Sequence, residues 1–204
     1  MRISYEVKRG IIFGFILLIV ALLYAFKNAS FLLRVISTIA ALLAFYTVDL
    51  LFKIDFHLRH YIFIVIMVIT GFLFSPGYYI YPNYDKILHF ILPIMASSMV
   101  FFIIDKLNIR LKWKLLFTFS TIVGFLCLFE LSEFWLDYFF DLKLQGVFLR
   151  GLQGLEKYKL ILDPNTDTMI DLMLGTLGSI TYVGLRWLVS LNRYVQLKVK
   201  KIFT

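Results

Sequence analysis

Charged residues and cysteine are scarce in this sequence. Only 17% of its 204 residues are charged, and Cys127 is its one cysteine. One cysteine cannot form a disulfide within the chain, and Cys127 stands in an apolar run, where a cysteine is usually a small packing residue. The chain also lacks any motif for binding RNA or DNA, so its excess of basic residues does not indicate a nucleic-acid partner.

Apolar side chains, by contrast, are abundant. Hydrophobic residues make up 61% of the chain, including 22 Phe and 12 Tyr. A soluble domain of this size could not bury so much apolar surface, because its ratio of surface to volume is too high. Inside a lipid bilayer, an apolar residue is favourable on every side of a helix. The composition therefore predicts an integral membrane protein.

Six stretches are long and apolar enough, or nearly so, to cross a bilayer as helices. A spanning helix needs about 20 mostly apolar residues, with a range of about 17 to 25. The stretches are 10–26, 31–52, 61–74, 86–104, 113–139 and 167–190, of which the third is short. We therefore predict an all-α fold, a polytopic membrane helix bundle of about six transmembrane helices that forms a single domain over residues 1–204.

The first stretch resembles a signal peptide, because Lys8 and Arg9 precede an apolar run. Cleavage after Ala29 would, however, place Lys27 where a signal peptidase needs a small residue. We therefore predict that the first stretch is kept as an uncleaved span.

The distribution of lysine and arginine favours one orientation. With the N-terminus inside, 13 of the 21 basic residues fall on the inner side and 7 on the outer side, while Arg186 lies within the last stretch. Cytoplasmic loops carry the excess of positive charge in membrane proteins. We therefore predict that both termini are cytoplasmic and that the chain is a multi-pass protein of the inner, or cytoplasmic, membrane.

Acidic residues and one histidine recur at the same end of the last three stretches. A charged side chain at the centre of a spanning helix costs about 2.5 to 3.5 kcal/mol, so it needs a partner or a function. In the predicted topology these residues all lie near the outer face, and each pair has the spacing that places two side chains on one side of a helix. The pairs are Asp85 and His89, Glu130 and Glu133, and Asp167 and Asp171.

These six residues predict a site for a cation. Bare carboxylates in such number could not share a medium of low dielectric constant, so either several are protonated or a cation lies among them. Carboxylates with one histidine suit a divalent ion such as Mg, Mn, Zn or Fe. We expect all six residues as candidate metal ligands. The candidate catalytic groups are His89, Glu130, Glu133 and Asp171.

Structural roles stay open for several of these residues. Asp85 can cap the N-terminus of its helix, and Asp167 can favour the dipole of the last helix. Lys86 can neutralise one of the acids. Glu130 and Glu133 are harder to explain in this way, because each would still need a buried partner.

Other residues in the stretches predict packing rather than chemistry. Asp49 can pair with Lys53 at the i,i+4 spacing. Pro93 is expected to kink its helix. Gly175 and Gly178 are expected to allow close approach of neighbouring helices. We assign a catalytic role to none of them.

Three motifs, taken in order, resemble a known family. They are Asp85-Lys86-Ile87-Leu88-His89-Phe90, then Phe129-Glu130-Leu131-Ser132-Glu133-Phe134-Trp135, and then Asp163-Pro164-Asn165-Thr166-Asp167-Thr168-Met169-Ile170-Asp171-Leu172 with Gly175. Together they resemble the YjdF-like family of inner-membrane proteins over about residues 60–190 and, more loosely, the VanZ-like proteins. The resemblance maps the acidic and histidine positions of the family onto the same six residues. It implies no substrate, because the family has no established activity.

The predicted site is compatible with three functions. A metal, or carboxylates that share a proton, could activate water against a lipid or lipid-linked substrate, which would make the protein a metal-dependent hydrolase. The spans nevertheless contain no arginine cluster for phosphate. The same acids could bind a cation or relay protons in a transporter, although the chain shows no inverted repeat. In a non-enzymatic accessory protein they would be a polar tie between helices. The partners that the sequence predicts are membrane lipids.

Overall fold

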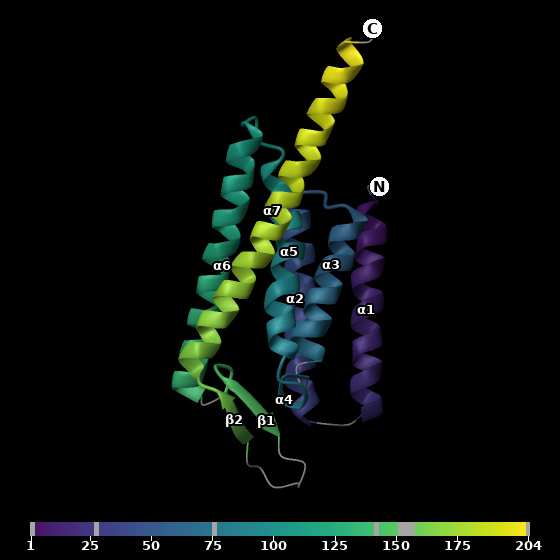
Figure 1. Ribbon diagram of the computed structural model, residues 1–204. Helices are drawn as coiled ribbons and strands as arrows, with labels where there is room; N and C mark the ends of the chain where they lie inside the picture. The colour runs from purple at the N-terminus through teal and green to yellow at the C-terminus, as the bar shows by residue number, and fades with distance from the viewer. Residues whose placement is uncertain (1–2, 27–28, 75–76, 141–142, 151–157, 203–204) are drawn as a thin grey trace. The chain divides into compact units, whose positions relative to one another are not determined.

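The computed structural model describes the chain apart from residues 1–2, 27–28, 75–76, 141–142, 151–157 and 203–204 (Figure 1). Its elements are α1 (Tyr5–Phe26), α2 (Ala29–Leu51), α3 (Leu58–Val68), the π-helical turn η1 (Ile69–Leu73), α4 (Gly77–Ile80), α5 (Tyr84–Ile104), α6 (Leu111–Phe140), β1 (Val147–Arg150), β2 (Tyr158–Leu162) and α7 (Pro164–Ile202). The predicted all-α fold class is confirmed, with one small two-stranded sheet, β1–β2, added to it.

The chain forms two compact units. One comprises residues 1–88 and 148–159, and the other comprises residues 89–147 and 160–204. The boundary between them falls inside α5, which is nevertheless one continuous helix. The single domain over residues 1–204 stays a prediction.

The first unit is built on α1, α2 and α3, which lie side by side (Figure 1). α1 and α2 bury aliphatic side chains, with Ile12, Ile19 and Leu42 at most 1% exposed. Aromatic rings connect α2 to α3, because the ring of Phe45 packs against Phe56 and Tyr61, each at 5.1 Å between centroids. The end of this unit near the α2–α3 turn is therefore held by ring packing as well as by aliphatic contacts.

The second unit is built on α5, α6 and α7, and α6 and α7 pack along each other (Figure 1). α5 and α7 run parallel, because successive residues of α5 meet successive residues of α7. The hydroxyl of Ser97 donates to the hydroxyl of Ser179 at 3.3 Å, and one turn further the ring of Phe101 packs against Tyr182 at 6.1 Å. Parallel packing places the N-terminal ends of α5 and α7 at the same level.

Three helices of the described part are both long and apolar enough to cross a membrane. They are Tyr84–Ile104, Leu111–Phe140 and the part of α7 from Pro164 to Asn192, and they match the last three predicted spans to within a few residues. Val35–Leu51 and Leu58–Gly71 are shorter apolar helices. The second and third predicted spans fall on these, and six crossings in total stay a prediction.

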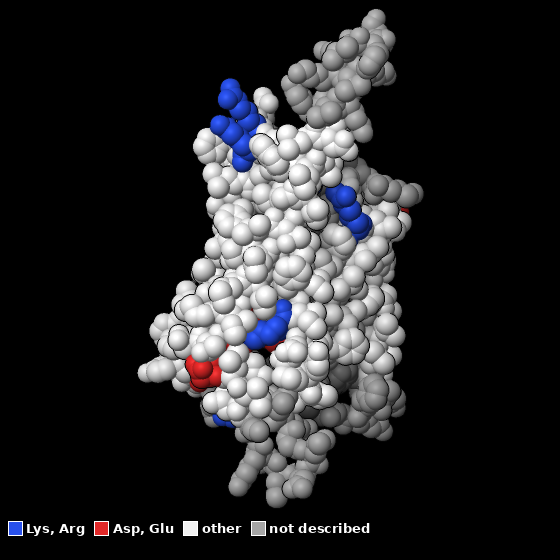
Figure 2. Space-filling view, in the orientation of Figure 1, with Lys and Arg blue, Asp and Glu red and all other residues white. Residues whose placement is uncertain are grey.

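The surface of the molecule agrees with a lipid environment. Among the described residues on the face drawn in Figure 2, charged side chains are few and separate from one another. Phe125, Leu128 and Leu185 are among many large apolar side chains that are more than half exposed on α6 and α7. Such faces are stable in lipid and would be costly in water.

Candidate metal centre

The first turns of α5 carry two of the predicted site residues. Asp85 lies in the first turn, and His89 follows it by one helical turn on the same side. Asp85 is thus inside the helix rather than before it, since α5 begins at Tyr84. Asp85 therefore does not have the predicted role of N-cap. Its carboxylate is also paired with Lys86, at 3.1 Å between Oδ2 and Nζ, as the sequence suggested.

Close packing brings α7 against α5 just beyond these residues. A Cβ added to Gly178 would overlap the backbone carbonyl oxygen of Phe90 and would also touch Pro93. Only glycine permits this approach, because the obstructing atom is backbone and cannot rotate away. The prediction that Gly178 allows close helix packing is confirmed, and Asp171 reaches the level of His89 as a result.

Asp85, His89 and Asp171 form the one group with metal-ligand geometry in the described part of the chain. Each offers one ligand atom, and these atoms all lie within 4.8 Å of one another. Because α5 is a continuous helix, Asp85 keeps its place one turn before His89. Asp171 is 2% exposed. Carboxylate oxygens and an imidazole nitrogen are ligands that proteins use for divalent ions such as Mg, Mn, Zn or Fe.

Glu130 of α6 lies close to His89 but is not one of the three grouped residues. The distance from its Oε1 to Nδ1 of His89 is 3.8 Å, and the two side chains are 7% and 10% exposed. A histidine that binds a metal through one nitrogen usually turns its other nitrogen toward a carboxylate, which fixes the ring and raises its basicity. With Nε2 of His89 toward a metal, Glu130 would have this supporting role at Nδ1.

Gly175 sets the distance between α6 and α7 at this level. A Cβ added to it would lie 2.6 Å from Cδ1 of Leu126. α6 and α7 therefore approach each other closely one turn after Asp171, as predicted for Gly175. Here the obstructing atoms belong to a flexible side chain, in contrast to the backbone oxygen that faces Gly178.

Asp167 holds a loop in place. Its Oδ2 accepts the backbone N–H of Gly146 at 2.7 Å, and its side chain is 3% exposed. The amide of Gln145 donates to Thr168 at 3.1 Å, so two neighbouring loop residues bind the first turns of α7. Asp167 is thus engaged by backbone and is not one of the three grouped residues.

A second acid, Asp137 on α6, fixes the same loop from the other side. Its two carboxylate oxygens accept the backbone N–H groups of Leu144 and Gln145, each at 2.8 Å. Lys143 and Gly146 have positive φ angles of 56° and 90°, so the loop makes sharp local turns between these anchors. Asp137 was not among the predicted site residues. The signal in the sequence was an acidic residue just before a turn-rich segment.

Asp163 begins α7. Its Oδ1 accepts the backbone N–H of Thr166 at 3.0 Å, which is the N-cap arrangement. This bond favours the charged carboxylate and holds the pKa of Asp163 below its ordinary value. The cap starts the helix that delivers Asp167 and Asp171 one turn apart.

Glu133 is half-buried on α6, three residues after Glu130. It is not in the group of three, and its predicted roles as ligand and catalytic residue stay predictions, as do the ligand roles of Glu130 and Asp167.

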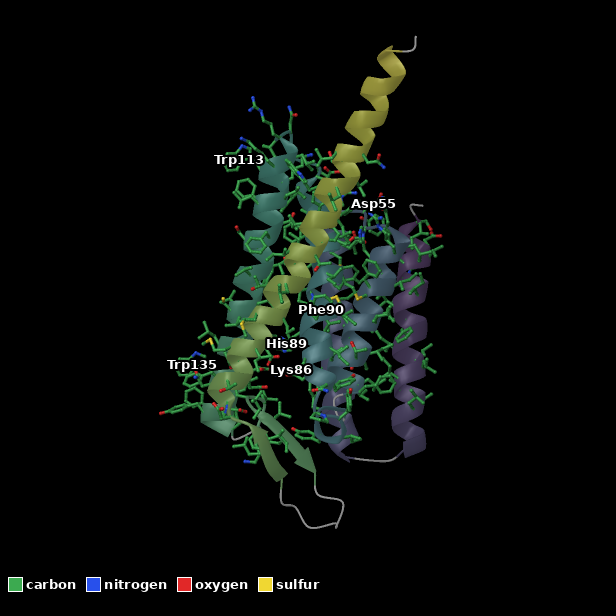
Figure 3. All side chains as sticks on the ribbon, viewed as in Figure 1. Asp55, Lys86, His89, Phe90, Trp113 and Trp135 are labelled. Atoms are coloured by element: carbon green, nitrogen blue, oxygen red, sulfur yellow. The ribbon has the colours of Figure 1, made fainter. Side chains whose placement is uncertain are left out.

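Two tryptophans indicate how deep the site lies. Trp113 and Trp135 are near opposite ends of α6, about 33 Å apart at 1.5 Å per residue. Tryptophan is enriched at both membrane–water interfaces, and this separation is close to the thickness of the apolar core. Figure 3 shows His89 nearer to the Trp135 end. His89 is thus placed toward the end of α6 that carries Trp135 rather than toward the end that carries Trp113.

Sequence reasoning missed a second buried polar cluster, in the first unit. Asp49 was interpreted as a partner of Lys53, but its Oδ2 accepts Nζ of Lys8 at 3.0 Å, and both side chains are fully buried. The two residues are 41 positions apart, so no local spacing could reveal the pair. The signal that was present is a charged residue, Lys8, at the start of an apolar helix.

Comparison with known families gives one match, and it covers most of the chain. Residues 8–192 match the family described as "Predicted membrane protein (DUF2238)". Comparison with curated proteins and with solved structures gives no match.

Proposed function

The chain belongs to the DUF2238 family of predicted membrane proteins, and from this premise we propose that it is a divalent-metal protein of the inner membrane that hydrolyses a lipid or lipid-linked substrate. DUF2238 is the YjdF family, so the predicted resemblance to that family is confirmed. The looser resemblance to VanZ-like proteins stays a prediction.

The observation that carries the proposal is the meeting of Asp85, His89 and Asp171 within 4.8 Å. Three charged or ionisable side chains from two parallel helices are costly at this depth unless a cation joins them. A divalent ion would offset the two carboxylates, and Glu130 would hold the ring of His89. The three-ligand set leaves room for water, whose pKa such an ion lowers toward neutrality.

The position of the site favours a substrate with a polar head and an apolar tail. His89 lies nearer to Trp135 than to Trp113 (Figure 3), and a tryptophan at the end of a spanning helix favours the level of the lipid head groups. Lys86, whose side chain is 15% exposed beside Asp85, is a cation that an anionic head group could approach. A soluble substrate would not need a site among apolar helices.

Metal content tests the proposal first. We expect the purified full-length protein to retain a divalent ion, and Asp171→Asn and His89→Ala to lose it. Asp105→Asn is the matched control, because Asp105 follows the other end of α5 and pairs on the surface with Lys114. Wild-type protein that folds normally and binds none of Mg, Mn, Zn or Fe would contradict the proposal.

Hydrolysis is tested separately, in proteoliposomes made from bacterial lipids with the ion that the protein retains. We expect water-soluble head-group products with the wild type, and none with Asp171→Asn. A metal-loaded protein that releases no product, yet moves that ion across the vesicle membrane, would favour a transporter.

A further inference from the structure

One basic side chain in the apolar part of α7 has no carboxylate partner in the described part of the chain. Arg186 lies within Pro164–Asn192, the stretch that is apolar enough to cross a membrane. Its Nε is buried and has no hydrogen-bond partner there, and Cζ of its guanidinium lies 4.4 Å from the centre of the Phe101 ring on α5. A cation in an apolar span is costly unless an anion or the head-group region is within reach.

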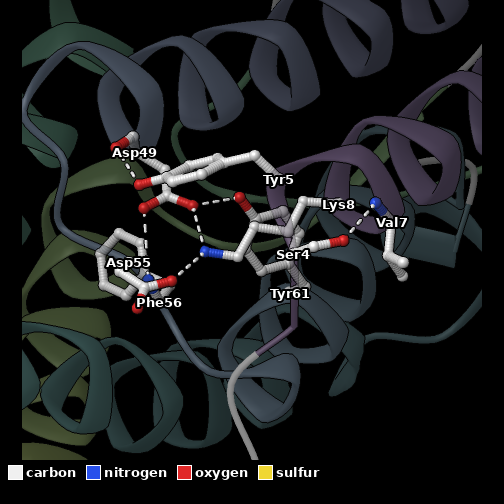
Figure 4. Close-up of polar contacts among 8 residues, drawn as sticks. All are labelled: Ser4, Tyr5, Val7, Lys8, Asp49, Asp55, Phe56 and Tyr61. Carbon is white, nitrogen blue, oxygen red and sulfur yellow. Dashed lines mark hydrogen bonds and ion pairs between the residues drawn. The ribbon is translucent and has the colours of Figure 1, made fainter.

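The buried cation of the first unit, by contrast, has carboxylates beside it. Nζ of Lys8 lies 3.0 Å from Oδ2 of Asp49 and 2.9 Å from Oδ1 of Asp55 (Figure 4). The charge of Lys8 is therefore compensated within the chain. Arg186 has an aromatic ring where Lys8 has carboxylates, so its counter-ion is not supplied by the described residues.

Arg186 is held beside the end of α5 that leads into α6. The ring that it faces, Phe101, lies in the last turn of α5, and residues 105–110 connect this turn to α6. Nζ of Lys114 lies 2.9 Å from Oδ1 of Asp105 and 2.6 Å from its backbone oxygen. This pair ties the first turn of α6 to the end of α5, so α6 begins near the level of Arg186.

The connection between α5 and α6 carries exposed basic residues. Residues 105–114 contain four basic residues and one acidic residue, Asp105, which is paired with Lys114. Arg110 and Lys112 are exposed, and neither forms an ion pair within the described part of the chain. Figure 2 shows basic side chains gathered at this end of α6. The surface here therefore has a net positive charge.

Exposed aromatic rings lie directly beside these cations. Nζ of Lys112 is 5.3 Å from the centre of the Trp113 ring, which stacks on Phe117 one turn further along α6 at 6.4 Å. Trp113 and Phe117 are 46% and 48% exposed, and Trp187, next to Arg186, is 44% exposed. Tryptophan is enriched at the level of lipid head groups. The cations thus lie at that level, and the apolar surface continues toward the middle of α6.

A phospholipid with a negatively charged head group matches both parts of this surface. Its phosphate oxygens accept hydrogen bonds from guanidinium and ammonium groups, and its acyl chains pack on exposed rings. A soluble phosphate would match the cations but leave the rings uncovered. A zwitterionic head group brings its own cation, which the basic residues repel. Basic clusters beside a spanning helix attract anionic lipids for this reason.

We propose that this end of the second unit binds an anionic phospholipid of the adjoining leaflet, with Arg110, Lys112 and Arg186 as its cations and Trp113 as its apolar wall. The site shares no residue with the candidate metal centre. Phe101 lies 12 residues after His89, about 18 Å further along α5. The proposal therefore goes beyond the proposed hydrolysis and stands independently of it.

Quenching of Trp113 fluorescence by brominated lipid tests the site. Full-length protein with Trp135→Phe and Trp187→Phe keeps Trp113 alone, because the chain has three tryptophans. The vesicles contain phosphatidylglycerol and phosphatidylcholine in equal amounts, and only one of the two lipids is brominated. We expect brominated phosphatidylglycerol to quench Trp113 with a several-fold higher apparent affinity than brominated phosphatidylcholine. Equal quenching by the two lipids would overturn the proposal.

Removal of charge at the site, compared with the same removal elsewhere, tests which residues bind the lipid. Arg110→Gln/Lys112→Gln changes two exposed positions and should lower the preference for phosphatidylglycerol several-fold, and Arg186→Gln should also lower it. The matched control Arg9→Gln/Lys53→Gln removes the same charge from exposed positions of the first unit and should keep the preference. An undiminished preference in Arg110→Gln/Lys112→Gln, or an equal loss in the control, would overturn the proposal.

Inorganic phosphate distinguishes a lipid from a soluble anion. Phosphate added to the same vesicles should displace brominated phosphatidylglycerol from Trp113 no better than sodium chloride of equal ionic strength. Displacement by phosphate but not by sodium chloride would mean that the surface binds a soluble phosphate, and the proposal of a lipid site would be overturned.

Discussion

At the scale of single residues, the four acidic residues near His89 have different surroundings. Asp85 and Asp171 have ligand atoms within 4.8 Å of that of His89. Oε1 of Glu130 lies 3.8 Å from Nδ1 of His89, and Asp167 accepts the backbone N–H of Gly146. Of the three roles, only the loop anchor Asp167 is seen directly, whereas the ligand roles of Asp85 and Asp171 and the support by Glu130 belong to the proposed metal site. Only the position of each side chain distinguishes these roles.

Substitution of Glu130 should show whether this residue supports His89 or binds the metal itself. We expect Glu130→Gln to lower the affinity for the metal by about 10- to 100-fold without abolishing binding, because glutamine would leave His89 with an uncharged partner. A competition titration with a metal-sensitive dye measures this affinity. Glu133→Gln is the matched control, three residues along α6, and should bind nearly as well as wild type. Loss of binding in Glu133→Gln as complete as in Asp171→Asn would restore Glu133 to the ligand set.

Residue spacing could predict part of this arrangement. The i,i+4 pair Asp85 and His89, and the late Asp171, followed from their place on helices of known period. The separate role of Asp167 did not, because its partner is a backbone N–H in a loop 21 residues earlier. The pairing of Asp49 with Lys8 was also hidden, since it depends on which helices pack together.

At the scale of helices, two glycines set how closely α7 approaches its neighbours. Gly178 faces a backbone oxygen of α5, and Gly175 faces the side chain of Leu126 on α6. Backbone atoms move only with their whole helix, whereas a leucine can change rotamer. The two contacts should therefore respond differently to one added methyl group.

We expect Gly178→Ala to lower the free energy of unfolding by about 1 to 3 kcal/mol, the usual cost of overpacking, and to reduce metal binding by shifting α7 away from His89. Gly175→Ala should cost less than Gly178→Ala, because Leu126 can adjust. Thermal unfolding in detergent and metal content measure both effects. Gly124→Ala on α6 is the control, since nothing lies within 4 Å of its added Cβ. An equal loss in all three variants would mean that helix spacing does not control the site.

Apolar patterning predicted the membrane helices well and their continuations poorly. The predicted spans 86–104 and 113–139 differ from α5 and α6 by at most two residues at either end. α7, however, runs for 39 residues, about 58 Å, and thus passes beyond the predicted end at 190. The polar segment after Asn192 has no proline or glycine to stop a helix. Hydropathy does not indicate that the helix continues there, because the segment is not apolar. The strands β1 and β2 were not predicted. They are short, and the turns and glycines around them hide the pattern of a strand.

At the scale of the whole molecule, orientation decides on which side the site opens. The count of basic residues placed both termini in the cytoplasm, and Lys8 was counted as an inner charge. Lys8 is buried in an ion pair instead, so it does not contribute a free surface charge. Twelve basic residues then remain on the inner side against seven, and the predicted orientation is unchanged.

Labelling of single cysteines can test this orientation. In a Cys127→Ser background, Leu144→Cys lies in the exposed loop beside the site, and Asn108→Cys lies in the exposed loop at the opposite end of α6. Because α6 is 30 residues long and apolar enough to cross a membrane, the two loops should face opposite sides. We expect a membrane-impermeant maleimide added to whole cells to label Leu144→Cys at once, and Asn108→Cys only after the membrane is permeabilised. The reverse pattern would place the metal centre at the cytoplasmic face, and labelling of both from one side would mean that α6 does not cross.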